Sequence, residues 1–255
     1  MEEAKITCIY DEGALEGTPY IGAKGFSVLI EVDGEKTLFG VGRRPRYFSA
    51  NLYESETDPE SINRAVVSHR HLDHWGGLPG LLRSRETPLD VYAPASAWGT
   101  KTMLGATGIF LSADHDGQYV KKDVTDWVQL SEHLFISSPM NFHEGKGEEI
   151  FVVLIEKNGP VLISGCCHCG LDHAFEMVKD RFGEYPNAVI GGLHIGEKKD
   201  KLADVYAEYL KNNGCRHLYL NHCTGVFGIG RLRVTLGLHG VNDFYAGQSV
   251  TFRII

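Results

Sequence analysis

Short runs of Val, Ile, Leu, Phe and Tyr recur along the chain, each bounded by Gly, Asp, Asn or Pro. This pattern is typical of β-strands that end in tight turns. Strands are predicted at 5–10, 26–32, 64–69, 151–157, 161–164, 188–192, 217–220 and 249–254. Helices are predicted at 76–84, 171–182 and 198–213, the last from apolar residues spaced three or four apart before Gly214. Strands alternating with helices indicate a layered α/β protein.

Two segments of the chain resemble each other. Residues 26–40 and 151–165 each read as a strand, a turn containing Asp-Gly or Asn-Gly, and a second strand. Such turns are strong hairpin signals. The repeat predicts two similar halves packed together, with chance likeness of two hairpins as the alternative. We expect one domain over residues 1–255, with the irregular stretch 105–130 as a loop or insertion over a site.

The net charge of the chain limits the kinds of partner that it is expected to bind. It has 33 acidic and 25 basic residues and a formal net charge of −8. This disfavours a nucleic-acid-binding surface, which usually carries a basic stripe. No uncharged apolar run approaches the ~20 residues needed to span a bilayer. The acidic N-terminus also lacks the layout of a signal peptide. We expect a cytoplasmic protein without nucleic-acid or membrane partners, and the oligomeric state stays open.

Four metal-ligand side chains fall within six residues. His69, His71, Asp73 and His74 follow the apolar run 65–67 in the order H-x-H-x-D-H. In an extended chain residues i, i+2 and i+4 point the same way, so the first three side chains can converge. A turn at Asp73 can bring in His74. Imidazole and carboxylate ligands suit zinc, and also manganese, iron or cobalt. The alternative is a polar turn with incidental histidines.

Three more histidines follow a positional rule. His168, His194 and His222 each come just after a short apolar strand, in a turn that contains Gly. In layered α/β proteins, sites form where the carboxyl ends of strands meet. Together with the dense motif, this predicts a two-metal site. His168 and His194 are interpreted as ligands, whereas His222 could bind metal, contact substrate or act as an acid or base.

The motif SHRHLDHWGGL at 68–78, with its flanking order, resembles the metallo-β-lactamase superfamily. The resemblance covers nearly the whole chain. It implies an αββα sandwich with a metal centre at one edge of two facing sheets. A finer resemblance, to proteins like dihydropterin-methyl-ribofuranosylaminobenzene-phosphate synthase, rests on 165–170, 191–194 and 222–225.

The resemblance implies two divalent metal ions, zinc first, with manganese or iron as alternatives. The implied ligands are His69, His71, Asp73, His74, Cys166, His168 and His194. His69 and His71 would hold the first metal. Asp73 and His74 would hold the second, which His194 would complete.

Three residues have alternative places in this scheme. His168 would complete the first site or lie between the metals. Cys166 stands where many members have a bridging aspartate and is a possible thiolate ligand. His143 is the alternative third ligand of the first metal.

One position departs from the family pattern. Members usually read Leu-Phe-Asp-Thr-Gly where this chain reads Leu-Phe-Gly-Val-Gly at 38–42, so Gly40 replaces an aspartate that orients the metal-binding loop. Loss of such a partner typically costs 10–100-fold in metal affinity or activity. If the loop keeps its family position, Gly40→Asp is expected to tighten metal binding.

The implied reaction is hydrolysis of a small anionic, phosphorylated substrate by metal-activated water. Asp73 would accept a proton from the water and His222 would protonate the leaving group. Guanidinium groups match phosphate in a bidentate way. The expected substrate-binding residues are Arg43, Arg44, Arg46 and Asn51.

Two other functions stay open. The finer resemblance implies a synthase-type transferase, in which an aryl-ribose phosphate displaces diphosphate from a pterin. A non-catalytic metal or redox sensor is suggested by Gly40 and by four cysteines near the site: Cys166, Cys167, Cys169 and Cys223. RNA cleavage, known elsewhere in the superfamily, is disfavoured by the charge.

Overall fold

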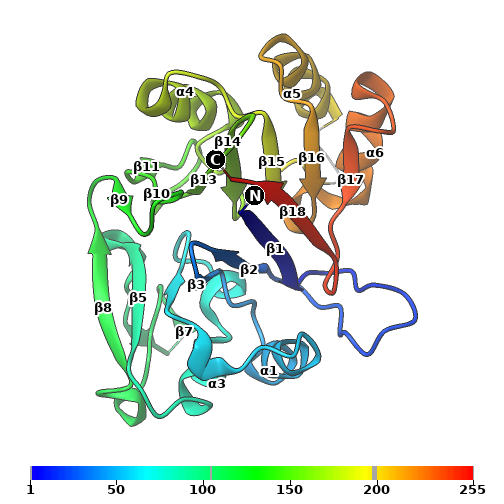
Figure 1. Ribbon diagram of the computed structural model, residues 1–255. Coiled ribbons are helices and arrows are strands. Elements are labelled where there is room, and N and C mark those ends of the chain that lie inside the picture. The colour runs from blue at the N-terminus through cyan, green and yellow to red at the C-terminus, as the bar shows by residue number, and fades with distance from the viewer. Residues whose placement is uncertain (1, 104, 197–199, 255) are drawn as a thin grey trace.

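The computed structural model describes residues 2–103, 105–196 and 200–254 and contains two seven-stranded sheets (Figure 1). The first sheet belongs mainly to the N-terminal half. In spatial order its strands are β18 (Ser249–Arg253), β1 (Glu3–Tyr10), β2 (Ser27–Val32), β3 (Glu35–Phe39), β4 (Arg64–Val66), β5 (Leu89–Pro94) and β8 (Tyr119–Val124).

The second sheet is built by the C-terminal half. In spatial order its strands are β17 (Val241–Asp243), β16 (His217–Leu220), β15 (Ala188–Gly191), β14 (Gly159–Ser164), β13 (Val152–Glu156), β10 (Leu134–Ile136) and β9 (Val128–Gln129). Two small ribbons complete the strands: β6 (Lys101–Thr102) with β7 (Gly105–Ala106), and β11 (Met140–Asn141) with β12 (Glu148–Glu149).

Each sheet contains the hairpin that the repeat predicts. Strands β2 and β3 pair antiparallel around a turn at Asp33 and Gly34, both with positive φ (54° and 74°), as a type I′ turn requires. Strands β13 and β14 pair antiparallel around residues 157–158. Parallel strands follow each hairpin: β4, β5 and β8 in the first sheet, and β15, β16 and β17 in the second. The two similar halves are therefore confirmed.

Helices cover the outer faces of both sheets (Figure 1). The α-helices are α1 (Pro45–Glu54), α2 (Leu72–Trp75), α3 (Leu78–Arg83), α4 (Leu171–Phe182), α5 (Asp200–Asn212) and α6 (Gly225–Leu236). Short 3-10 turns are η1 (Pro59–Ser61), η2 (Ala95–Ala97), η3 (Ala113–His115) and η4 (His222–Thr224). Within the described ranges, none of these helices has both the length and the apolar character needed to cross a membrane.

Three buried apolar clusters explain the layering. Consecutive residues of a strand point to opposite faces, so Val152 and Leu154 pack between the sheets while Val153 packs against the helices. A third cluster joins the outer face of the first sheet to α1 and α3, for example through Phe48 and Leu81. Helix, sheet, sheet and helix therefore lie in sequence, and the predicted αββα sandwich is confirmed.

Several predicted boundaries change. Strand β4 ends at Val66 rather than at residue 69, and the stretch 105–130 holds the edge strand β8 rather than only a loop. Residues 198 and 199 of the predicted helix 198–213 lie outside the described residues. Helices α1 and α6 were not predicted.

Candidate metal centre

The candidate site lies where β4, β14, β15 and β16 end, at one edge of the two sheets. The H-x-H-x-D-H motif leaves β4 and turns into α2, whereas the other candidates occupy the turns that follow β14, β15 and β16. These are parallel neighbouring strands, so their carboxyl ends meet at one edge.

The three turns of the second sheet have unusual backbones. Cys167, His194 and His222 have positive φ angles of 64°, 51° and 50°. Residues other than Gly rarely adopt positive φ angles, and holding one such residue in this conformation costs about 1–3 kcal/mol of folding free energy. Each of the three turns contains one of them. The strained backbone is therefore concentrated beside the candidate ligands.

The first donor set comprises His69, His71 and His168, whose ligand nitrogens lie within 4.8 Å of one another. The His69 Nε2 and His71 Nδ1 atoms are 3.0 Å apart. The His168 ring centroid lies 4.8 Å and 4.9 Å from those of His69 and His71. The alternative ligand His143 is close by, with its backbone N–H donating to the His168 carbonyl at 2.9 Å, but its Nε2 lies 3.2 Å from Nδ1 of His173 and is not part of this set. Of the two predicted candidates, the structure brings His168 to this set.

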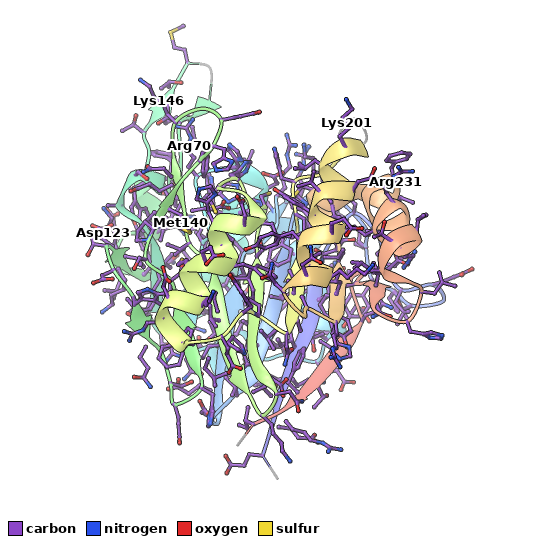
Figure 2. All side chains as sticks on the ribbon, turned by 90° about the horizontal axis from the view of Figure 1, so that it is seen from above. Arg70, Asp123, Met140, Lys146, Lys201 and Arg231 are labelled. Carbon is purple, nitrogen blue, oxygen red and sulfur yellow. The ribbon has the colours of Figure 1, made fainter. Side chains whose placement is uncertain are left out.

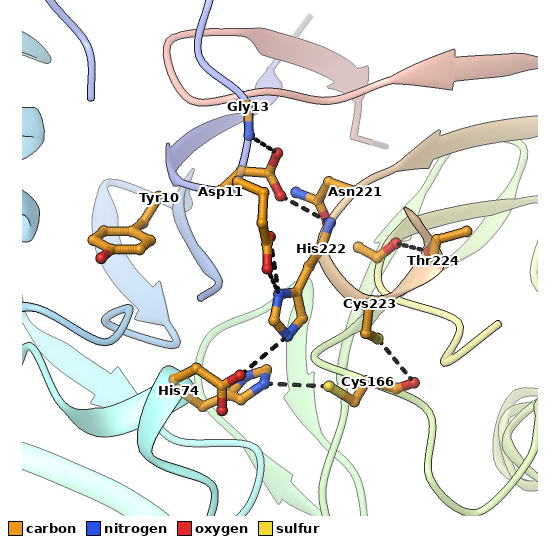
Figure 3. A network of polar contacts seen from close by, with 12 residues as sticks. Tyr10, Asp11, Gly13, His74, Cys166, Asn221, His222, Cys223 and Thr224 are labelled. Carbon is orange, nitrogen blue, oxygen red and sulfur yellow. Dashed lines mark hydrogen bonds and ion pairs between the residues drawn. The ribbon is translucent and has the colours of Figure 1, made fainter. Parts of the chain in front are cut away.

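The second donor set comprises Asp73, His74 and His222, also within 4.8 Å. The His222 Nε2 lies 4.0 Å from Asp73 Oδ2, and the rings of His74 and His222 are 5.0 Å apart (Figure 3). Sequence reasoning placed His194 here. The structure corrects this assignment, because the turn after β16 rather than the turn after β15 presents its imidazole to Asp73.

A third donor set contains sulfur. Cys166, His194 and Cys223 offer ligand atoms within 4.8 Å of one another. Cys166 also groups with His69 and His74, and its Sγ lies 3.3 Å from His74 Nε2. Cys166 therefore links the histidine sets to the sulfur set, as Figure 3 shows.

Two acidic residues near the N-terminus hold His222 in place. The Asp11 carboxylate accepts hydrogen bonds from the backbone N–H of His222 and of Gly13, both at 2.8 Å. The Glu12 carboxylate oxygens each lie 3.1 Å from His222 Nδ1, which directs Nε2 towards Asp73 (Figure 3). A carboxylate behind a ligand histidine fixes its tautomer and ring orientation. Sequence reasoning missed both residues, because Glu12 lies 210 positions from His222 and no motif marks it.

A serine holds the histidines of the motif. The Ser68 hydroxyl lies 2.9 Å from His69 Nδ1 and 3.4 Å from His74 Nδ1. A Cβ on Gly165 would lie 2.4 Å from this hydroxyl, so glycine there leaves room for it. Ser68 can therefore orient two imidazoles, a role that sequence reasoning sought in the missing aspartate.

The environment of Gly40 argues against restoring that aspartate. Gly40 is buried with φ of 72°, and a Cβ there would lie 2.4 Å from the carbonyl oxygen of Phe26. An aspartate would therefore have both an unfavourable backbone and no space. This corrects the expectation that Gly40→Asp would tighten metal binding.

Burial controls the charges of the motif histidines. Desolvation, and then the neighbouring imidazoles, hold the pKa of His69 and of His74 well below the usual range. Burial alone would also lower the pKa of His222, but its hydrogen bond to Glu12 and the charge of Cys223 raise the pKa to about 9. Neutral imidazoles are the form that a metal ion requires, so His69 and His74 are already in that form, whereas His222 must lose a proton when an ion binds.

Two further groups with shifted pKa values are Cys223, in one of the sulfur turns, and Glu149, in β12 beside another. Burial alone would raise the pKa of Cys223, but contacts with Cys166 and His194 hold it well below the usual range. Burial raises the pKa of Glu149 to about 8, although its Oε1 accepts a hydrogen bond from the Cys169 N–H at 2.6 Å. Sequence reasoning missed this buried carboxyl behind the cysteine turn.

The residues present fit a metal ion. The donor sets offer imidazole, carboxylate and thiol groups in the numbers that zinc and related ions use. The Nδ1 of His194 is buried and has no hydrogen-bond partner among the described residues. Buried polar atoms are rarely left in this state.

A cavity of about 410 Å³ opens beside the first donor set. Its lining includes His71 and His168, the cationic residues Arg70 and Lys146, the acidic Glu144 and the ring of Phe142. Arg70 and Lys146 lie at the same end of the molecule in Figure 2. The cavity thus combines candidate metal ligands with positive charge suited to an anion.

The predicted substrate-binding residues lie elsewhere. Arg44 and Arg46 line a different pocket, of about 810 Å³, together with Arg83. Arg43 is half-buried and is not among the residues that line the cavity beside the histidines.

Asn51 is fully buried, and its side-chain amide is used by the backbone. It donates to the carbonyls of Ile9 (2.8 Å) and Ile21 (3.0 Å) and accepts from Ile21 N–H (2.8 Å). The prediction that Asn51 binds substrate is therefore wrong, and Arg70 and Lys146 replace the predicted arginines as candidates.

The fold and this arrangement of ligands define a class of protein. Residues 22–185 match the model of the metallo-beta-lactamase superfamily, and the chain belongs to that superfamily. Its members generally bind metal ions, in agreement with the donor sets described above.

Three known proteins illustrate its relationships. The chain is 23% identical to 7,8-dihydropterin-6-methyl-4-(beta-D-ribofuranosyl)-aminobenzene-5'-phosphate synthase of Methanocaldococcus jannaschii, over 88% of this chain and 89% of that protein. It is 36% identical to a ribonuclease Z of Methanococcus maripaludis, over 70% of this chain but 51% of that protein. A crystal structure of a metal-dependent hydrolase of the beta-lactamase superfamily superposes with a TM-score of 0.80. This last match has 22% identity and covers 97% and 98% of the two chains, which shows a shared fold.

Proposed function

We propose that this protein is a metal-dependent hydrolase that cleaves a small phosphorylated substrate. The observation that carries the proposal is the position of the cavity. It brings Arg70 and Lys146 to the same opening as His71 and His168 of the first donor set. A site for anions beside a site for cations is the arrangement that phosphate-ester cleavage requires.

The first donor set would hold one ion and the second set would hold another. Zinc suits these ligands, and manganese or iron are alternatives. When bound, the ions supply a water acidic enough to attack at neutral pH and neutralise charge on the phosphate oxygens.

The protein groups have separate tasks. Arg70 and Lys146 attract and orient the phosphate. In this proposal the Asp73 carboxylate, which lies beside His222, accepts the proton of the attacking water. Its position favours the role predicted from the sequence. His222, held by Glu12, is better placed as a ligand than as the acid that protonates the leaving group.

The test is hydrolysis of a panel of small phosphomonoesters and phosphodiesters by protein loaded with Zn²⁺, Mn²⁺ or Fe²⁺, measured as phosphate released from the monoesters and as alcohol released from the diesters. We expect turnover that a chelator abolishes and that His71→Ala abolishes. The matched control is His239→Ala, which removes an exposed imidazole that does not line this cavity. Metal-loaded protein that turns over no member of the panel, or equal rates for wild type and His71→Ala, would exclude the proposal.

A second candidate is a synthase-type transfer with release of diphosphate. The likeness to the Methanocaldococcus synthase, which extends over most of both chains, favours it. Here an aryl-ribose phosphate replaces water as the nucleophile. Diphosphate release that depends on that acceptor would identify it, and precursor tRNA belongs in the same panel because of the ribonuclease relative.

A further inference from the structure

The proposed reaction leaves one cluster of ligands without a role. Cys166, His194 and Cys223 come from the turns after β14, β15 and β16, and their ligand atoms lie within 4.8 Å of one another. They form neither of the two sets assigned to the reaction. Cys166 connects them to those sets through the 3.3 Å contact of its Sγ with His74, and the His194 ring lies 4.3 Å from the ring of His168.

The backbone around Cys223 is shaped to admit its sulfur. A Cβ on Gly192 would lie 2.6 Å from Cys223 Sγ, so any larger residue would occupy the space of the thiol. The backbone N–H of His194 donates a hydrogen bond to the same sulfur at 3.3 Å. His194 does so with a φ of 51°, a conformation that costs about 1–3 kcal/mol. The fold thus maintains this juxtaposition at a cost in backbone strain.

The ring of His194 provides a second, independent observation. Its Nδ1 is buried and has no hydrogen-bond partner in the part of the chain that the structure describes. A buried imidazole nitrogen without a partner is unfavourable, and a coordinated ion is one of the few groups that can satisfy it.

The chemistry of this set differs from that of the other two. Two sulfur atoms and one imidazole make a Cys₂His combination, which zinc uses in tetrahedral sites with a fourth position open. Soft thiolate ligands also select Cu(I) over the harder ions that carboxylates prefer. The set centred on Asp73 and the set centred on Cys223 therefore favour different metals.

We propose that Cys166, His194 and Cys223 form a third metal site, which binds a thiophilic ion of the zinc or copper(I) type. The site lies directly beside the two histidine-based sets, and Cys166 also groups with one histidine of each, His69 and His74. Both thiols lose their protons when the ion binds. The inference does not depend on which reaction the neighbouring sets catalyse.

The test uses cobalt as the probe. Reduced, metal-free protein is titrated anaerobically with Co²⁺, and the sulfur-to-cobalt charge-transfer absorbance in the near ultraviolet is recorded. Wild type should develop this absorbance, and Cys223→Ser should lose about half of it because one of two sulfur ligands is gone. The double variant Cys166→Ser/Cys223→Ser should show none. Cys215→Ser, which removes another buried thiol before β16, should match wild type.

Two results would overturn the proposal. One is an absence of charge-transfer absorbance in wild type, and the other is equal absorbance in wild type and Cys223→Ser. If Cys223→Ser does not fold, His194→Ala provides the decision. Loss of a residue that only orients a ligand typically lowers metal affinity 10–100-fold. His194→Ala removes a ligand, so it should weaken cobalt binding at the sulfur site by at least that factor. Unchanged affinity would contradict the site. The absorbance is read without substrate, so it stays independent of the hydrolase assay.

Discussion

The two halves of the metal centre reach the same edge of the sandwich by different routes. The first half takes its ligands from six consecutive residues after β4, between His69 and His74. The second half takes them from three separate turns, each with a non-glycine residue at positive φ. The first route depends on local geometry. The second depends on the pairing of β14, β15 and β16, so its ligands are sensitive to changes in the packing between turns.

The largest effect on metal binding is expected in the half of the metal centre that the contiguous motif provides. Replacing His69 and His71 together with Ala removes two members of the first donor set. Elemental analysis of the purified protein should show loss of the metal bound there. His143→Ala, the matched control, should retain wild-type content, because its ring contacts His173 instead. Wild-type metal content in the double variant would show that the set is wrongly assigned.

Gly40→Asp should destabilise the fold strongly. The new Cβ would lie 2.4 Å from the Phe26 carbonyl oxygen, at a buried position with φ of 72°. Overpacking and a buried unpaired carboxylate together should cost about 3 kcal/mol or more. Urea unfolding of the metal-free protein measures this. A stable variant with tighter metal binding would restore the family interpretation of this loop.

Gly192→Ala tests the half of the metal centre that is built from the three separate turns. Its Cβ would meet Gly165 O at 2.4 Å and Cys223 Sγ at 2.6 Å, so we expect a loss of about 1–3 kcal/mol in the free energy of unfolding. Gly230→Ala is the matched control. It lies in α6 with no atom within 4 Å of the added Cβ, and should stabilise by about 0.5–1 kcal/mol. Equal stability of the two variants would argue that the turns have space to spare.

Glu12→Ala tests the contact by which the N-terminal half of the chain orients the ring of His222, which lies in the C-terminal half. Without the carboxylate, His222 Nδ1 loses its partner, and metal affinity should fall about 10–100-fold. Competition with a chelator measures the affinity, and Glu16→Ala, another exposed acid in the same segment, is the control. An affinity equal to that of the control would mean that the ring is oriented by packing alone.

The smallest effect concerns a second set of hydrogen bonds between the N-terminal and C-terminal halves of the chain, outside the metal centre. Asp33, in the β2–β3 turn, accepts hydrogen bonds from Ser131 Oγ (2.6 Å) and His133 N–H (2.8 Å). Partial burial alone would raise the pKa of Asp33, but these bonds hold it below its usual value. Asp33→Asn should therefore cost about 1 kcal/mol at neutral pH.

The pH dependence of that loss has a definite sign. Because the folded pKa is lowered, the stabilisation is present above the unfolded pKa of about 3.9 and is lost as the pH falls through the folded value. Wild type and Asp33→Asn should therefore converge in stability at strongly acidic pH. Asp180→Asn, on the exposed side of α4, should follow wild type throughout. A difference between wild type and Asp33→Asn that does not change with pH would contradict this account.

Most elements of the fold could be predicted because their signals are local. Strand β16 was predicted at its observed bounds, and so was helix α4. Helix α6 was missed because Gly225, Gly228 and Gly230 lower its helix propensity. Strand β8 was missed because its exposed lysines interrupt the apolar pattern at the edge of the sheet.

The site divides in the same way. The contiguous motif could be read from the sequence, and so could the clustering of histidines at strand ends. Which turn faces which ligand could not, because the rotation of His194 and His222 depends on backbone angles that no residue pattern specifies. The contacts of Asp11 and Glu12 were inaccessible for another reason, since they join residues more than 200 positions apart.

The pairing of β18 with β1 has a consequence for how the protein is made. Thr7 in β1 and Ser249 in β18 are 242 positions apart, yet their side chains are hydrogen-bonded at 2.9 Å. At ribosomal rates of 5–20 residues per second, one edge of β1 waits about 10–50 seconds for its partner during translation. An unpaired edge is a template for association with other chains. Asp11 and Glu12, just after β1, wait nearly as long for His222, so the second donor set assembles late in synthesis, and metal loading there must follow it.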